Sequence, residues 1–285
     1  MSWISSAVFM FISSVVLYLT IRKSQIQKVP IETYSLAMFA IPAAVYFIII
    51  ILSGGAFSIS VSNLTGIIFA AIFFSFLGNW FSQKAITLSP NPGYSLVISK
   101  SYVVMTTIFA VIFLHSALSL KNALAIILIV FFSALISIDT GKKKKSHGYL
   151  WFLLSIGAFF TWGFLALFSK YILDQGMDVF SYLFYLTVFA SVCIAFEALM
   201  KKAKLEIDRK NAVPLILIGI SSVAFNFYMQ TGYKLSPNPG YINAVNVSSI
   251  TLVTVLSHFF FRDELNIRKI VGIIGVTLGL FLLFL

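Results

Sequence analysis

LSPNPGY occurs twice in this sequence, at residues 88–94 and at residues 235–241. The two copies lie 147 positions apart in a chain of 285 residues, so each half contains one copy at a similar place. Self-similarity at a long, fixed offset indicates a repeated structural unit, and it constrains the architecture before any local feature is considered. The motif therefore predicts that the chain is built from two copies of one unit.

Polar residues outside the motif align in the same register. Two triplets match at this offset, Ser75, Asn79 and Gln83 in the first half and Ser222, Asn226 and Gln230 in the second. We predict a first repeat over residues 1–138, a basic linker over residues 139–148 and a second repeat over residues 149–285. The linker, DTGKKKKSHG, has the charge and glycine content that are typical of a boundary between units.

The composition indicates a membrane protein. Hydrophobic residues make up 60% of the chain, charged residues make up 10%, and the mean hydropathy is +0.99. A water-soluble domain of this length needs far more polar surface. Apolar runs of roughly 18–20 residues, long enough to cross a bilayer core, recur without the alternation of a β-barrel. We predict an all-α protein with ten membrane spans, at about residues 2–21, 33–53, 63–83, 94–114, 121–138, 149–169, 179–199, 212–231, 241–261 and 268–285.

The basic residues indicate how the chain is inserted. The net charge is +11, but nearly all Lys and Arg residues lie in short loops between apolar runs, which does not favour nucleic-acid binding. Sixteen of the 20 follow odd-numbered spans, and three follow even-numbered spans. The positive-inside rule then places the odd-numbered loops in the cytoplasm and both termini outside. Because each repeat has five spans, the second enters from the opposite side, and the repeats are inverted.

The prolines of the motif predict where four spans begin and end. Pro90 and Pro92 lack an N–H and restrict the residue before them, so the third span should stop here and the fourth should start. The second copy predicts the same for the eighth and ninth spans. One interpretation is a rigid turn, with Tyr94 and Tyr241 anchored at the membrane interface. The other is that freed backbone groups line a cavity.

The polar triplets predict two inward-facing helix surfaces. Members of each triplet are four residues apart, so they lie on one face of a helix. Amide side chains that faced lipid would lack hydrogen-bond partners, so both faces should point into the protein. Two interpretations remain open, because the triplets could form hydrogen bonds between helices or could line a cavity.

Lys100 is the basic residue placed well inside a predicted span. It follows Tyr94 by six residues, roughly 9 Å along a helix. Its side chain could extend to the headgroups, or it could offer a positive charge to an anionic group of a substrate. The candidate substrate-binding residues are Asn79, Gln83, Lys100, Asn226, Gln230, Asn243 and Asn246, with Trp80, Trp162 and Tyr228 as aromatic walls.

The sequence contains no motif for catalysis or for a cofactor. The nine acidic residues lie in loops or near span ends, away from the bilayer centre where proton relays usually lie. Metal-binding, nucleotide-binding and nucleophile motifs are absent from the sequence, and the single cysteine, Cys193, excludes an intrachain disulfide. We therefore expect a protein that is not an enzyme and that uses neither a metal nor another cofactor.

Ten spans in two inverted repeats, with a polar turn before the fourth and ninth, resemble the drug/metabolite transporter superfamily and specifically its EamA-like members. The clearest local similarity is FFRDELNIRKIVGIIGVTLGLFLL at residues 260–283, an acidic turn before a Gly-rich last helix, with Glu264 at the place of the family's glutamate. Val104 and Thr251 stand where the family has a proline. The resemblance implies transport of small polar solutes through a cavity lined by spans 1, 3, 4, 6, 8 and 9.

These inferences predict a secondary transporter of small polar metabolites such as amino acids, an exporter or exchanger in the cell membrane that works by alternating access. The expected partners are a small-molecule substrate and the lipid bilayer, but not nucleic acid. Gly275 and Gly279 fit either internal packing of the last span or a homodimer contact. Two alternatives remain open: a membrane scaffold or accessory subunit in which the polar faces only join helices, and a flippase for lipid-linked sugars.

Overall fold

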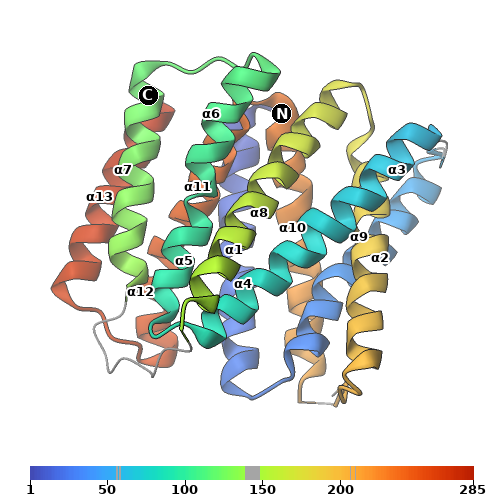
Figure 1. Ribbon diagram of the computed structural model, residues 1–285, viewed down its shortest axis with the longest axis horizontal. Coiled ribbons are helices and arrows are strands. Elements are labelled where there is room, and N and C mark those ends of the chain that lie inside the picture. Colours follow the sequence, from blue (N-terminus) through green and yellow to red (C-terminus); the bar gives the residue numbers. More distant parts are fainter. Residues whose placement is uncertain (56, 58, 139–147, 206, 209) are drawn as a thin grey trace.

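The computed structural model is a bundle of helices that are long and apolar enough to cross a membrane (Figure 1). It describes residues 1–55, 57, 59–138, 148–205, 207–208 and 210–285. Ten such spans lie within these residues, as the sequence predicts. The predicted linker lies outside the described residues, apart from Gly148.

Seven spans are single helices: α1 (Trp3–Ile26), α2 (Ile31–Leu52), α7 (Leu120–Ser137), α8 (Leu150–Asp174), α9 (Val179–Met200), α10 (Ala212–Leu235) and α13 (Ile267–Phe284). The third span is divided into α3 (Val61–Phe69), a π-helical segment η1 (Ala70–Phe76) and α4 (Leu77–Leu88). The fourth is divided into α5 (Pro92–Lys100) and α6 (Tyr102–Leu114), and the ninth into α11 (Pro239–Ser248) and α12 (Ile250–Phe261).

The repeats are inverted in space, as predicted. Both termini lie at one end of the bundle, which we call the terminus face, and the loops that follow α1, α4, α9 and α12 lie at the other, which we call the odd-loop face (Figure 1). The two LSPNPGY turns consequently lie at opposite ends. Helix packing follows the same symmetry: α2 packs on α9, α7 packs on α13, and the contact of α4 with α8 is repeated by α10 with α1.

Each LSPNPGY copy forms the predicted break between spans. Pro92 and Pro239 occupy the first helical positions of α5 and α11. Asn91 Oδ1 accepts a hydrogen bond from the N–H two residues later at 2.9 Å, and Asn238 Oδ1 does the same at 2.8 Å. The asparagine therefore caps the new helix. This cap was not predicted from the sequence, although asparagine directly before an N-terminal proline is its ordinary signal.

The fourth and ninth spans change direction at serines. Ser101 separates α5 from α6, and its Oγ donates to the Val97 carbonyl at 2.7 Å. Ser249 separates α11 from α12, and its Oγ donates to the Asn246 carbonyl at 2.7 Å. Hydroxyls bonded to the preceding turn tend to bend helices. Serine thus accompanies these breaks in spans where the resembled family has proline.

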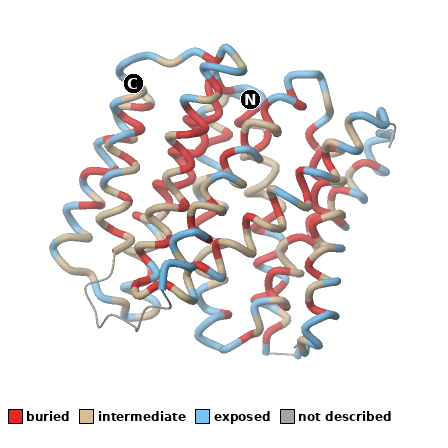
Figure 2. The backbone as a smooth tube through the Cα atoms, in the orientation of Figure 1, coloured by how far each residue is buried: buried red, intermediate tan, exposed pale blue. Residues whose placement is uncertain are grey.

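Small residues decide how the last span packs. A Cβ at Gly275 would overlap the ring of Phe132 on α7, and a Cβ at Gly279 would crowd Ile129 on the same helix. The glycine face is therefore covered inside the protein. Figure 2 shows buried positions gathered toward the middle of the bundle, and every residue of α11 is buried. This helix is the half-span around which the site is built.

Candidate substrate-binding site

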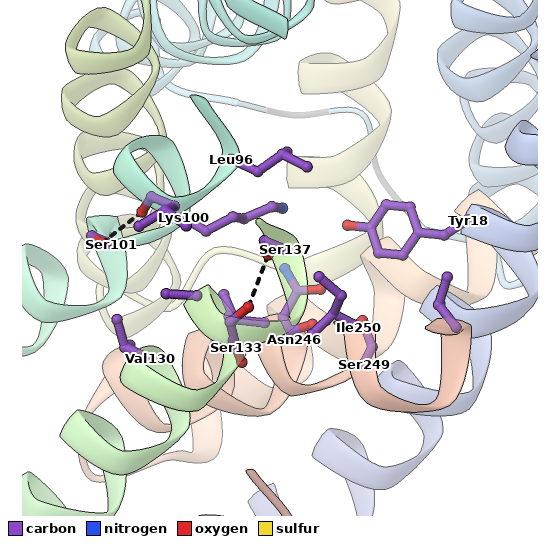
Figure 3. Close-up of a pocket in the computed structure, with 14 residues that line it drawn as sticks. Tyr18, Leu96, Lys100, Ser101, Val130, Ser133, Ser137, Asn246, Ser249 and Ile250 are labelled. Carbon is purple, nitrogen blue, oxygen red and sulfur yellow. Dashed lines mark hydrogen bonds between the residues drawn. The ribbon is translucent and has the colours of Figure 1, made fainter. Parts of the chain in front are cut away.

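A cavity of about 170 Å³ lies among α1, α5, α7, α11 and α12 (Figure 3). We call it the Lys100 cavity. Its wall is mostly aliphatic, and its polar members are Tyr18, Lys100, Asn246, Ser101, Ser133, Ser137 and Ser249. Because α5 begins the fourth span and α12 ends the ninth span on the same side, the cavity lies between half-spans of the two repeats.

Lys100 extends across this cavity toward Tyr18 (Figure 3). Its Nζ lies 4.7 Å from the centroid of the Trp162 ring and 5.7 Å from the centroid of the Tyr18 ring, distances at which a cation is attracted to an aromatic face. In the part of the chain that the structure describes, no carboxylate forms an ion pair with Lys100. The Lys100 charge therefore faces two aromatic rings and, among the described residues, no counter-ion.

Two asparagines of α11 have different roles near this cavity. Asn243 is fully buried, and its Oδ1 accepts hydrogen bonds from the hydroxyls of Tyr102, at 3.2 Å, and Tyr233. Asn246 is also buried, and its Oδ1 has no hydrogen-bond partner among the described residues. Asn246 lines the Lys100 cavity, whereas Asn243 supports the helix behind it.

The first polar triplet faces a different cavity. Asn79, Trp80 and Gln83 line a space of about 210 Å³ between α2, α4 and α9. Asn79 Nδ2 donates to the Ser75 carbonyl at 2.8 Å, and Gln83 Nε2 lies 3.4 Å from the Ser35 hydroxyl on α2. Of the two interpretations of the triplets, cavity lining therefore describes this one. The π-helical segment η1 contains Ser75 and lies directly before α4, which carries the two amides, and π-helical turns are frequent at functional sites.

A charged cluster borders this second cavity at the odd-loop face. Lys201 Nζ lies 3.2 Å from Glu32 Oε1 on α2 and 2.6 Å from Glu197 Oε1 on α9. The hydrogen bond to Glu197, with the bond to Glu32 and both negative charges adding to it, raises the pKa of Lys201 above its usual range. Because the lysine and the two carboxylates already satisfy one another, this rim joins α2 to α9.

The second polar triplet joins helices. Ser222 Oγ donates to the Met38 carbonyl on α2 at 2.8 Å, and Asn226 Nδ2 donates to the Ser222 carbonyl at 2.8 Å. Gln230 is 1% exposed, and its Oε1 has no partner in the described structure. Interhelical bonding therefore describes Ser222, whereas the bond of Asn226 stays within α10, and the two repeats use equivalent residues differently.

The structure separates the ten candidate residues into three groups. Lys100 and Asn246 share one cavity, with Trp162 beside the lysine. Another cavity contains the first triplet's amides and Trp80. The remaining four pack within the bundle: Asn226, Gln230, Asn243 and Tyr228, whose ring stacks on Phe9 at 5.1 Å. Tyr18 was not among the residues predicted from the sequence. Its position amid the aliphatic residues of the first span was a signal that could have identified it.

The Lys100 cavity adjoins a third cavity that reaches the odd-loop face. This space of about 320 Å³ shares Tyr18 and Val253 with the Lys100 cavity. Its outer rim contains Arg22 and Asp263, which form an ion pair at 3.1 Å, together with Glu264 of the acidic turn. A solute at the odd-loop face would therefore meet a polar vestibule before Lys100.

The terminus face is closed over the same region. Asn238 Nδ2 donates to the Thr107 carbonyl of α6 at 3.2 Å, and Gly240 lies so close that a Cβ there would overlap Thr107. Tyr241 donates its hydroxyl proton to the Ala117 carbonyl at 3.1 Å. We call these contacts the terminus-side seal. The Lys100 cavity thus lies below packed helices on one side and beside a vestibule on the other.

Ten apolar spans in inverted five-span repeats, with a positively charged cavity between the repeats, define a polytopic membrane protein of the architecture used by secondary transporters. Residues 149–285, the second predicted repeat, match the sequence model of the EamA-like transporter family, which supports the resemblance of the chain to the drug/metabolite transporter superfamily.

Solved structures share the fold. One, described only as the crystal structure of a protein, superposes over 99% of this chain and 98% of that chain with a TM-score of 0.83. Its sequence is 13% identical, so the likeness concerns the fold alone. No curated protein matches this sequence.

Proposed function

We propose that the protein moves small polar solutes, amino-acid-like metabolites among them, across the cell membrane by alternating access, as an exporter or exchanger with its termini outside the cytoplasm. The observation that supports this most directly is the difference between equivalent ends of the two repeats. The Lys100 cavity adjoins a vestibule at the odd-loop face, and helix packing closes it at the terminus face.

Repeat-related residues have opposite environments at the two faces. Thr107 lies in the terminus-side seal, whereas its repeat mate, Thr254, lines the vestibule. Gly240 packs on Thr107, and its mate is Gly93. If the two repeats exchange their conformations, Gly93 approaches Thr254 and closes the odd-loop face while the terminus face opens. Such an exchange is how inverted repeats produce alternating access.

A solute-flux assay and cysteine labelling test the proposal. In a Cys193→Ser background, Thr254→Cys should react with a membrane-impermeant maleimide from the odd-loop side, and Thr107→Cys should react slowly from the other side. Proteoliposomes should take up at least one member of a panel of radiolabelled amino acids and small organic acids faster than empty liposomes. Absence of flux for every member, with Thr107→Cys unreactive under all conditions, would contradict transport.

A scaffold or accessory subunit is the second candidate. The hydrogen bond from Ser222 Oγ to the Met38 carbonyl, which joins α10 to α2, is the kind of contact that this alternative expects. It predicts that Thr254→Cys and Thr107→Cys keep the same reactivity whatever solute is present. Solute-dependent reactivity at either position would exclude it.

A further inference from the structure

We propose that the Lys100 cavity binds a small carboxylate with an apolar body and a hydrogen-bond donor beside the carboxylate, as in an α-hydroxy or α-amino acid. The inference names a substrate class for the proposed transporter and rests on that function only for the transport step. The three parts of the ligand follow from three features of the cavity.

The positive charge accounts for the carboxylate. Lys100 Nζ faces the cavity between the rings of Trp162 and Tyr18, and no described carboxylate pairs with it. A cation in a cavity wall favours an anionic partner because charge-assisted hydrogen bonds are the strong ones. None of the residues that line the cavity is acidic, so a purely cationic solute would meet only repulsion from Lys100.

The aliphatic wall accounts for the apolar body. The aliphatic residues that line the cavity include Leu96, Val97, Val130, Ile250 and Val253. The cavity measures about 170 Å³, and an engineered apolar cavity of about 150 Å³ holds a benzene molecule. A body of roughly that size fits, whereas a sugar would bring hydroxyls that this wall cannot satisfy.

Unpartnered acceptors account for the donor. Asn246 Oδ1 and Ser133 Oγ are buried, belong to residues that line the cavity, and have no hydrogen-bond partner in the described residues. Buried polar atoms in folded proteins are nearly always paired, so such atoms in a cavity wall indicate a missing partner. A hydroxyl or amine next to the carboxylate would reach Asn246 and Ser133 while the carboxylate stays at Lys100, because these three residues line one small cavity (Figure 3).

Three related probes test these parts on the purified protein. Mandelate has the carboxylate, a phenyl body and an adjacent hydroxyl, mandelamide replaces the carboxylate by a neutral amide, and phenylacetate lacks the hydroxyl. Isothermal titration calorimetry should give a Kd for mandelate that is about tenfold or more below that of mandelamide, since a hydrogen bond to a charged group is worth that much. Phenylacetate should bind more weakly than mandelate.

The variants assign the preference to particular groups. Lys100→Gln should bind mandelate and mandelamide with similar Kd, and Asn246→Ala should bind mandelate and phenylacetate with similar Kd. Lys121→Gln, an exposed lysine at the start of α7, is the matched control and should keep both preferences. A merely structural role for Lys100 would weaken all three probes together without removing the preference for the anion.

The outcomes separate this site from the transport function. Equal binding of mandelate and mandelamide by the unmodified protein, or binding of none of the probes, overturns the site without requiring any variant to fold. A preference for mandelate that survives Lys100→Gln also overturns it. Anion-selective binding without flux in proteoliposomes would support the proposed binding site and refute transport. Flux without a preference for the anion would refute the binding site and support transport.

Discussion

Replacing Lys170 by methionine should loosen the terminus face. Lys170 Nζ lies 2.9 Å from Asp174 Oδ1 on its own helix and donates to the Lys234 carbonyl at the end of α10 at 3.4 Å. Its side chain is 10% exposed, whereas that of Asp174 is 44% exposed. The bond to Lys234 joins α8 to α10 beside the terminus-side seal, so the seal loses a contact when the charge is removed.

The free-energy change expected for Lys170→Met depends on which of these contacts requires the terminus face to be closed. The pair with Asp174 lies within one helix, persists in either conformation and is partly screened by water. We expect the bond to the Lys234 carbonyl, which joins two helices, to break when the terminus face opens. A hydrogen bond from a charged group contributes roughly 1.5–3 kcal/mol, and this one is long, so about 1–2 kcal/mol is expected. That free energy changes the ratio of the two conformations by roughly 5- to 30-fold.

The assay is the labelling rate of Thr107→Cys in the Cys193→Ser background, measured from the terminus side with an impermeant maleimide. Lys170→Met should raise this rate by the factor given above. Lys23 is the repeat mate of Lys170 and is exposed at the odd-loop face, so Lys23→Met should leave the rate unchanged or lower it. An unchanged or slower rate in Lys170→Met, with an unaltered melting temperature, would refute the assigned contact.

Three further predictions concern stability. Asn238→Ala removes the cap of α11 and should lower the free energy of unfolding by about 1 kcal/mol, seen as a lower melting temperature. Gly275→Ile places a side chain against Phe132 and should cost roughly 1–3 kcal/mol by overpacking; a melting temperature equal to that of the unmodified protein would show that α7 is not seated there. The hydrogen bond to Glu197 raises the pKa of Lys201. The contribution of Lys201 to the free energy of unfolding should therefore be complete below the usual lysine pKa and should be lost as the pH rises through the raised value. Melting temperatures of Lys201→Gln and the unmodified protein should converge only in strongly alkaline buffer.

Local chemistry in the sequence was sufficient for the architecture. Apolar run length gave the ten spans, and the duplicated LSPNPGY gave the repeat, because a proline restricts the backbone wherever it occurs. An odd number of spans per repeat then required inversion. The cap formed by Asn91 and Asn238 was also readable, since it depends on only three consecutive residues.

The site was predictable only in part. Lys100 was identifiable because a lysine within a span is costly wherever it points. The sequence could not show that the two polar triplets differ, since both have the same spacing and residue types. In the structure, α4 presents its amides to a cavity beside α2, whereas Ser222 on α10 bonds directly to an α2 carbonyl.

The sequence by itself thus determined how many times the chain crosses the membrane and that its halves are inverted copies. The tertiary structure decided which polar faces meet a cavity and which face of the bundle is sealed. The reason is physical: an apolar side chain has a similar environment against lipid or against another helix, so hydropathy does not specify helix partners. Contacts between distant segments, such as Lys100 with Trp162 or Asn238 with Thr107, make that choice.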